Sequence, residues 1–240
     1  MSANTGVWLE DLTWPEAKAR FEAGMPVVIP IGAASKAHGP HLPLKTDALT
    51  ARALAQKLIE RLPVIAAPVV GFGFYPAFTA FAGSQHLSAV TFKALLTELL
   101  GSLRSHGVNR IVLLNTGVST EKPIDELAAS ATDLLVLHMR GLGAAADRLL
   151  DAPTGGHADE RETSVMLALE PRSVRMDRLA LDGPFEKTGA TGDPTRADAF
   201  KGERILAARV DDMAAAITKR WLDQGAPQSP TARLDSVTKE

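Results

Sequence analysis

The chain has 240 residues and contains no cysteine, which excludes disulfide bonds and thiolate metal ligands. Its formal net charge is -2 and 45% of its residues are hydrophobic, so its charge gives no reason to expect nucleic acid or an anionic membrane as a partner. No apolar run approaches the roughly 20 residues that span a bilayer, and the first residues lack the pattern of a signal peptide. We therefore expect a cytoplasmic protein.

Short apolar segments alternate with helical patterns along most of the chain. Buried strands are predicted at residues 26–31, 64–70, 110–114 and 133–138. Helices are predicted at residues 14–24, 47–61, 91–106, 123–130, 144–150 and 203–222, with one more that carries Val165, Met166 and Leu169. This alternation predicts an α/β fold of three layers, α/β/α, with a mostly parallel central sheet. We expect one domain over residues 1–222 and a disordered tail over 223–240, which is polar and lacks periodicity.

Residues 32–47 bring two histidines and an aspartate together in an irregular segment. His38 and His41 are three residues apart, and Asp47 follows nine residues after the first histidine. Glycine and proline between them prevent a regular helix or strand. The segment follows a predicted strand, where open α/β sheets place their ligands, and imidazole with carboxylate suits Zn, Mn or Fe. The alternative is a stiff turn whose histidines cap backbone groups, with Asp47 as a helix N-cap.

A second cluster of chemically active residues lies within residues 151–164. A pair of glycines precedes His157, and Glu160 and Glu162 follow at the start of a predicted helix. The N-terminus of a helix favours negative charge and so keeps Glu162 ionised and able to bind a metal. The alternative is that Asp159 and Glu162 only cap the helix. Because the cluster accompanies the His/Asp segment, we favour a functional site.

Three other segments could contribute to a pocket. Residues 71–83 are rich in glycine and aromatic residues, and Phe78 is predicted to stand in an apolar wall or to pack into the core. Asn115 and Ser119 follow the strand at 110–114. The long irregular stretch at 175–202 is predicted to form a lid or an oligomer contact.

These motifs resemble the creatininase (creatinine amidohydrolase) family. The likeness rests on residues 29–32, His38–Leu44 with Thr46 and Asp47, residues 156–158 with 162–164, and more weakly on 81–84, 87–88, 112–115 and 192–194. It covers about residues 8–220. The resemblance implies a creatininase-like fold, hydrolysis of C–N bonds, often in cyclic amides, by a metal-activated water, and a homo-oligomer, commonly a hexamer.

The resemblance also suggests roles for individual residues. His38, Asp47 and Glu162 are the expected ligands of one or two divalent ions (Zn, Mn or Fe). His157 and Glu160 are the expected catalytic residues, although His157 could instead complete the metal shell. The residues expected to bind a small-molecule substrate are His41, Phe78, Asn115 and Ser119.

Two departures from the family pattern bear on this expectation. The family usually has a glutamate ligand one or two residues before the first histidine, where this chain has Lys36 and Ala37. It also usually has a histidine after the third strand, where Asn115–Thr120 contains neither imidazole nor carboxylate. Ala37 in place of a glutamate predicts one metal ion, or a weakened second site, and impaired activity. A binding protein that kept the pocket but lost the chemistry, and a metal enzyme of another reaction class, are the alternatives.

Overall fold

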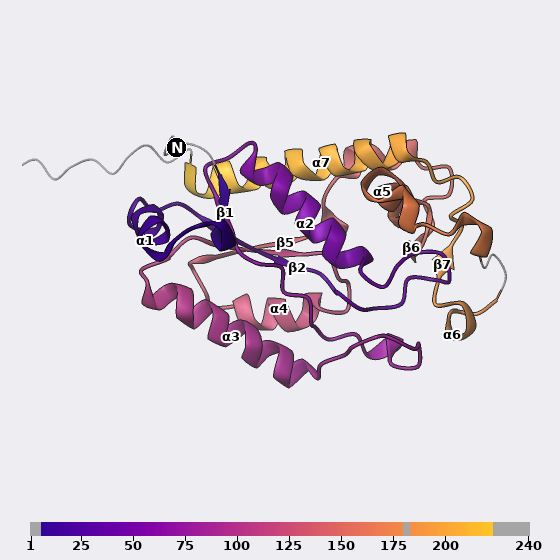
Figure 1. The fold of residues 1–240 in the computed structure, drawn as a ribbon, viewed down its shortest axis with the longest axis horizontal. Coiled ribbons are helices and arrows are strands. Elements are labelled where there is room, and N and C mark those ends of the chain that lie inside the picture. The colour runs from indigo at the N-terminus through magenta and orange to yellow at the C-terminus, as the bar shows by residue number, and fades with distance from the viewer. Residues whose placement is uncertain (1–5, 180–182, 223–240) are drawn as a thin grey trace, which may run out of the picture.

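A five-stranded sheet, parallel at every pairing, forms the centre of the protein (Figure 1). The computed structural model describes residues 6–179 and 183–222. In sheet order the strands are β1 (Val7–Trp8), β3 (Ile65–Ala66), β2 (Val27–Ile31), β4 (Ile111–Asn115) and β5 (Leu134–His138). Ile31 pairs with Asn115, and Asn115 pairs with His138. The carboxyl ends of these three strands therefore lie level at one edge of the sheet.

Helices cover both faces of the sheet (Figure 1). On one face lie α2 (Thr46–Ile59), α5 (Glu160–Leu169) and α7 (Ala199–Ile217), and on the other lie α1 (Trp14–Glu22), α3 (Ala89–Ser105) and α4 (Glu121–Ala128). Successive strand side chains alternate between the faces. In β2, Val28 packs in the core cluster beneath α2 and α7, whereas Ile29 packs in the cluster with α3. The predicted three-layer α/β fold is confirmed.

The remaining elements lie mostly beyond the carboxyl edge of the sheet. There β6 (Gly155–His157) pairs antiparallel with β7 (Thr191–Gly192), next to the short helix α6 (Phe185–Thr188). Single 3-10 turns occupy Leu9–Asp11, Pro76–Phe78, Met139–Gly141, Pro171–Ser173 and Met176–Arg178, a longer one occupies Ala144–Leu149, and a π-helical turn occupies Thr218–Leu222. Much of the stretch predicted as irregular at 175–202 thus forms short elements next to the sheet edge.

The structure corrects three predicted elements and adds one strand. The predicted strand at 64–70 is regular only at Ile65–Ala66 and afterwards makes one isolated bridge, because Pro68 has no N–H to donate to the ladder. β1 was not predicted, since two residues carry no periodic pattern. The predicted helix at 144–150 is a 3-10 helix. α7 begins four residues before the predicted start, at Ala199, because the Asp198 side chain accepts a hydrogen bond from the Lys201 amide at 2.8 Å and caps it. The predicted tail at 223–240 lies outside the described residues.

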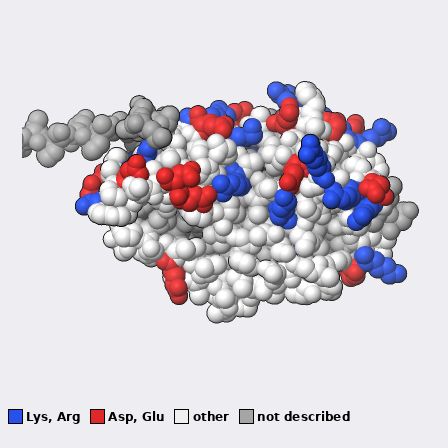
Figure 2. Space-filling view, viewed as in Figure 1, with Lys and Arg blue, Asp and Glu red and all other residues white. Residues whose placement is uncertain are grey.

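The surface seen in Figure 2 carries charges of both signs. Blue and red side chains are interspersed over the part of this face that includes α2 and α7, and the lower part is mostly uncharged. Within residues 6–179 and 183–222, no helix is both long enough and apolar enough to cross a membrane.

Candidate active site

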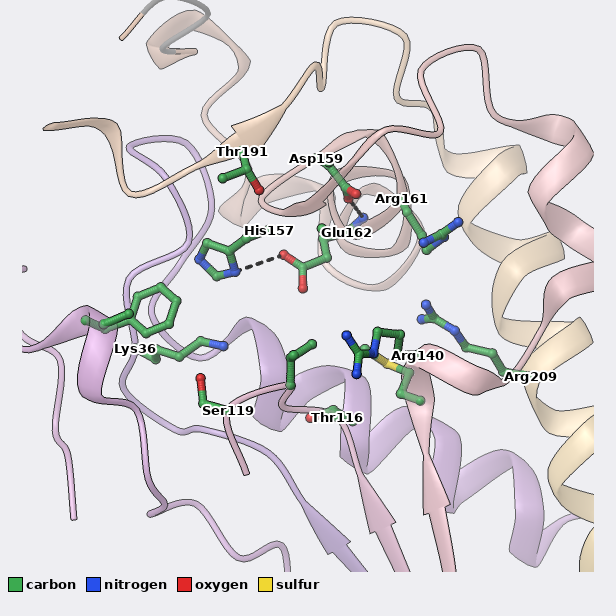
Figure 3. A pocket seen from close by; sticks show the side chains of 16 residues that line it. Lys36, Thr116, Ser119, Arg140, His157, Asp159, Arg161, Glu162, Thr191 and Arg209 are labelled. Atoms are coloured by element: carbon green, nitrogen blue, oxygen red, sulfur yellow. Dashed lines mark hydrogen bonds and ion pairs between the residues drawn. The ribbon is translucent and has the colours of Figure 1, made fainter. Parts of the chain in front are cut away.

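A cavity of about 490 Å³ lies at the carboxyl edge of the sheet, where the predicted site segments meet (Figure 3). The loop after β2 contributes Lys36, and the β6–α5 segment contributes His157 and Glu162. The other lining residues that bear on the chemistry are Phe78, Thr116, Ser119, Arg140, Asp159, Arg161 and Arg209. Segments far apart in the sequence therefore form one pocket, as the strand-end positions of the motifs predicted.

His38 lies at the base of this site and is fully buried. Its Nδ1 lies 2.8 Å from the Lys36 carbonyl oxygen, and its Nε2 lies 2.9 Å from Asp47 Oδ1. A carbonyl oxygen can only accept a hydrogen bond, so Nδ1 must carry a proton. The second ring nitrogen is thereby directed at a carboxylate.

His157, the last residue of β6, has a similar arrangement. Its Nε2 donates to the Ala37 carbonyl oxygen at 2.8 Å, and its Nδ1 lies 3.6 Å from Glu162 Oε2. The ring centroids of His157 and His38 are 4.6 Å apart. Each histidine is thus fixed by a backbone carbonyl of the 36–37 segment, which is how proteins orient metal-binding imidazoles.

His38, His157 and Glu162 could hold a metal ion together. Each offers one ligand atom, and these atoms lie within 4.8 Å of one another. In the neutral tautomer, Nδ1 of His157 presents a lone pair to a carboxylate oxygen, an arrangement that a cation between them would stabilise. Two imidazoles and a carboxylate are also a ligand set of catalytic zinc sites, which keep a further position open. The donor set therefore fits a divalent ion.

Lys36 places a positive charge in the same site. Its ammonium lies 2.6 Å from Asp47 Oδ2, and both side chains are almost fully buried. Burial alone would raise the pKa of Asp47, but the charges of Lys36 and then His38 outweigh it and hold that pKa well below its ordinary value. The ammonium also lies 4.9 Å from the centroid of the Phe78 ring. Asp47 is therefore ionised throughout the neutral range.

Burial shifts the titration of the other two groups in opposite directions. Burial first, and then the charges of His38 and Lys36, lower the pKa of His157 to about 2. Burial raises the pKa of Glu162. Aromatic rings cover His157, with centroids at 4.7 Å for Phe78 and 6.2 Å for Phe185 of α6. His157 is consequently a neutral imidazole, the form that binds metals.

The four residues expected at the substrate divide into two pairs. Phe78 and Ser119 line the cavity. His41 and Asn115 do not line the cavity and make other contacts instead. His41 Nε2 lies 2.9 Å from Thr163 Oγ1, and the Asn115 side-chain Nδ2 donates to the Gly117 carbonyl oxygen at 2.7 Å. These contacts indicate that His41 holds the 32–47 segment against α5, and that Asn115 shapes the loop after β4.

Glu160, expected as a catalytic residue, does not line the cavity. Its side chain is fully buried and accepts hydrogen bonds from the Ala152 amide at 2.6 Å, the Asp151 amide at 3.2 Å and Lys201 Nζ at 2.6 Å. These contacts anchor the start of α5 to the preceding loop and to α7. They indicate a structural role.

The capping alternatives have different outcomes. Asp159 caps α5, because its side chain accepts from the Glu162 amide at 3.0 Å. Glu162 accepts in turn from the Ala158 amide at 2.6 Å, and it also faces the cavity. The N-cap alternative for Asp47 is wrong, since α2 begins at Thr46 and its N-cap position is Lys45.

Sequence reasoning missed Arg209, a 4% exposed residue of α7 that lines the cavity. The helix buries Ile205, Leu206, Val210 and Met213 against the sheet. Arg209 falls within this apolar stripe at helical spacing, and an arginine is rarely buried without a partner. That irregularity in the pattern was the available signal.

The creatininase family model, described as creatinine amidohydrolase, matches residues 10–217. The chain belongs to the creatininase family. The resemblance seen in its motifs is thereby confirmed, along with the general class of hydrolases that this family contains.

Relatives and solved structures agree with this membership. The chain is 32% identical over 218 residues to a mycofactocin precursor peptide peptidase of Mycolicibacterium smegmatis, and the alignment covers 81% of this chain and 85% of the relative. It is 27% identical to a creatinine amidohydrolase of Pseudomonas putida, over 90% of this chain and 97% of the relative. A solved structure described as creatininase Mn superposes with a TM-score of 0.79 at 25% identity, covering 89% of this chain and 98% of its own.

Proposed function

We propose that this protein is a metal-dependent hydrolase of a C–N bond, with one divalent ion held by His38, His157 and Glu162. The observation that carries the proposal is the matched arrangement of the two histidines. Each donates one N–H to a backbone carbonyl of the 36–37 segment and turns its other nitrogen toward a carboxylate. Two of its relatives, a peptide peptidase and a creatinine amidohydrolase, are named for cleavage of C–N bonds.

The chain's own residues can assist such a reaction. When bound, a divalent ion would supply a water of lowered pKa and would polarise the substrate carbonyl. Lys36 lines the cavity and adds a fixed positive charge, which stabilises negative charge developing on the carbonyl oxygen. Phe78 and Phe185 cover His157 with apolar rings and reduce its access to water. The carbonyl oxygens of Lys36 and Ala37 orient His38 and His157 by accepting one N–H from each.

The position of Lys36 favours one metal ion over two. Its ammonium lies 2.6 Å from Asp47 Oδ2 and so occupies the carboxylate oxygen that a second cation would need. A divalent ion placed there would also be repelled by the ammonium. Ala37 offers no ligand atom in its side chain, and its carbonyl is already engaged by His157. We therefore propose a mononuclear site in which Asp47 Oδ2 pairs with Lys36, and Asp47 Oδ1 lies beside His38 Nε2, the nitrogen that would bind the ion.

Metal content and product analysis test this function. Protein supplied with Zn, Mn or Fe and then dialysed should retain about one ion per chain by elemental analysis. His157→Ala and Glu162→Gln should lose it, whereas Glu160→Gln, a carboxylate on the same helix that does not line the cavity, should retain it. Incubation with cyclic amides and short peptides should release the hydrolysis products at a rate that follows metal content.

The contrary outcomes separate the alternatives. Absence of bound metal after supplementation would favour a binding protein on this fold. If the protein binds metal but forms products to which no water has been added, another reaction class would be favoured. Two ions per chain would contradict the mononuclear site.

A further inference from the structure

Arg209 is a buried charge in the wall of the cavity. Arg209 is 4% exposed, and its side chain extends from α7 into the pocket (Figure 3). Across residues 6–179 and 183–222, its guanidinium forms no hydrogen bond or ion pair, and the buried Nε has no partner. A buried guanidinium of this kind destabilises the folded protein unless something compensates its charge.

The other cations that line the cavity are paired. Lys36 lies 2.6 Å from Asp47 Oδ2, and Arg161 Nη2 donates to Asp147 Oδ1 at 2.7 Å. Arg140 donates to Glu121. Within the described part of the chain, Arg209 is the cavity-lining cation whose charge has no such partner.

The carboxylates near Arg209 are engaged elsewhere. Glu162, Asp159 and Asp147 influence it only as charges at longer range. Glu162 accepts from the Ala158 amide, Asp159 accepts from the Glu162 amide, and Asp147 binds Arg161. Burial, and then the charge of Arg161, lower the pKa of Arg209 to about 10, so the guanidinium still carries its charge at neutral pH.

The surrounding structure holds the side chain in place. The Arg209 stem lies against Gly143, where an added Cβ would come within 2.8 Å of Arg209 Cγ. Gly143 also has a positive φ of 82°, which an L side chain rarely adopts. The glycine therefore leaves room for the stem, and the guanidinium is held at the cavity wall in advance of any ligand.

We propose that Arg209 binds a carboxylate of the substrate, across the cavity from His157. The planar guanidinium offers paired N–H donors that match a carboxylate. Asp159 and Glu162 line the same cavity, and they would repel a doubly charged phosphate more than a singly charged carboxylate. Given the proposed hydrolase function, on which this step rests, the substrate is an amide that carries a carboxylate, such as a peptide with a free C-terminus.

Binding of two small probes tests this assignment without relying on hydrolysis. N-acetylglycine carries the carboxylate, and N-acetylglycinamide replaces it with a neutral amide. By calorimetry, the protein should bind the first at least tenfold more tightly than the second. Arg209→Met and Arg209→Gln should reduce that preference to within twofold. Arg204→Met removes the same charge from an exposed position of the same helix and should leave the preference unchanged.

A thermal melt distinguishes a binding role from a structural one. If Arg209 serves a ligand, Arg209→Met should melt at the same temperature as the wild type or higher, because it removes an uncompensated buried charge while keeping an apolar stem. A purely structural role predicts a lower melting temperature. Loss of carboxylate preference together with unchanged or raised stability is the combination expected.

Three results would overturn the carboxylate site. They are equal binding of the two probes by the wild type, a preference that survives in both Arg209 variants, or tighter binding of inorganic phosphate than of N-acetylglycine. Failure of the proposed function looks different. If the protein prefers the carboxylate probe but hydrolyses no amide, the carboxylate site stands and the hydrolase proposal fails. If it hydrolyses amides without that preference, the hydrolase proposal stands and the carboxylate site fails.

Discussion

Lys36 and Asp47 form an ion pair inside the protein, with Lys36 Nζ 2.6 Å from Asp47 Oδ2 and both side chains at most 7% exposed. The pair lies beside the proposed metal ligands, since Asp47 Oδ1 is also 2.9 Å from His38 Nε2. A buried ion pair contributes little to net stability, but removing one partner leaves the other charge buried and uncompensated. The Lys36–Asp47 pair is therefore a point where stability and site chemistry depend on the same charges.

Lys36→Met should lower the free energy of unfolding at pH 7 by about 3 kcal/mol, the low end for breaking a buried pair, because His38 still faces Asp47. Urea denaturation measures this. Since Lys36 holds the pKa of Asp47 below its unfolded value, this contribution is present above the ordinary aspartate pKa and is lost as the pH falls through the folded one. The difference between wild type and variant should accordingly shrink at acid pH.

A surface pair gives the control for this prediction. Lys93 Nζ lies 2.8 Å from Glu126 Oε2, but the two side chains are 37% and 46% exposed. Lys93→Met should change the free energy of unfolding by no more than about 0.5 kcal/mol. Equal effects of the two substitutions would contradict the importance of burial at Lys36.

The lowered pKa of His41 predicts that the protein loses stability on mild acidification. Burial, and then the charge of His38, lower the pKa of His41 to about 4, against 6.5 for an ordinary histidine. Between these values the unfolded chain binds more protons than the folded one, so the free energy of unfolding falls as the pH is lowered through this window. The contribution of His41 amounts to at most about 3 kcal/mol.

Comparison with His41→Gln isolates this effect, because every other titrating group is common to both chains. Glutamine can still bond to Thr163 Oγ1, the present partner of His41 Nε2. The wild type should lose more stability than the variant between pH 6.5 and 4 in urea denaturation. Parallel pH profiles would mean that His41 does not carry the proton linkage.

Glu160→Gln should reduce stability without changing the site. The carboxylate accepts from two backbone amides and pairs with Lys201 Nζ at 2.6 Å, while Lys201 also contacts Asp151. Loss of the buried charge should cost about 3 kcal/mol in urea denaturation. Metal affinity should stay within twofold of wild type, because Glu160 does not line the cavity. A variant with normal stability and normal metal affinity that had lost hydrolysis would instead support the catalytic role expected from the sequence.

The sequence predicted those features that depend on local pattern. The apolar runs at 111–114 and 134–137 led to strands predicted at 110–114 and 133–138, which match β4 and β5 to within one residue. His38 and Asp47 were identifiable because they share one short segment after a strand, as were His157 and Glu162 before a helix. Once the strands are parallel, their carboxyl ends share one edge, and the two segments must approach each other.

Other features depend on direction or on distant contacts. Glu160 and Glu162 look equivalent in the sequence. On a helix, however, positions i and i+2 are rotated by about 200° around the axis, so these two side chains point to different sides. The pairing of Lys36 with Asp47 requires the loop to fold back on α2. Arg209 enters the cavity only because α7 packs against α5. The first contact leaves no local pattern in the chain, and the second leaves only a charged residue within the apolar stripe of α7.

Gly202 permits that close packing of α7 on α5. A Cβ added there would lie 2.0 Å from the Ser164 carbonyl oxygen and 2.5 Å from its carbonyl carbon, both in the backbone. Gly202→Ala must therefore push the two helices apart, and we expect a loss of about 1–3 kcal/mol, as for other overpacked sites. Because α7 carries Arg209 and α5 carries Glu162, the variant should also bind both metal and N-acetylglycine more weakly.

Gly101→Ala is the matched control, since Gly101 lies within α3 and an added Cβ there would meet no atom within 4 Å. It should stabilise the protein by about 0.5–1 kcal/mol through helix propensity alone and leave both ligands unaffected. Urea denaturation and calorimetry on the two variants measure these effects. If Gly202→Ala were as stable as Gly101→Ala and bound both ligands normally, the separation of α5 and α7 would not control the geometry of the site.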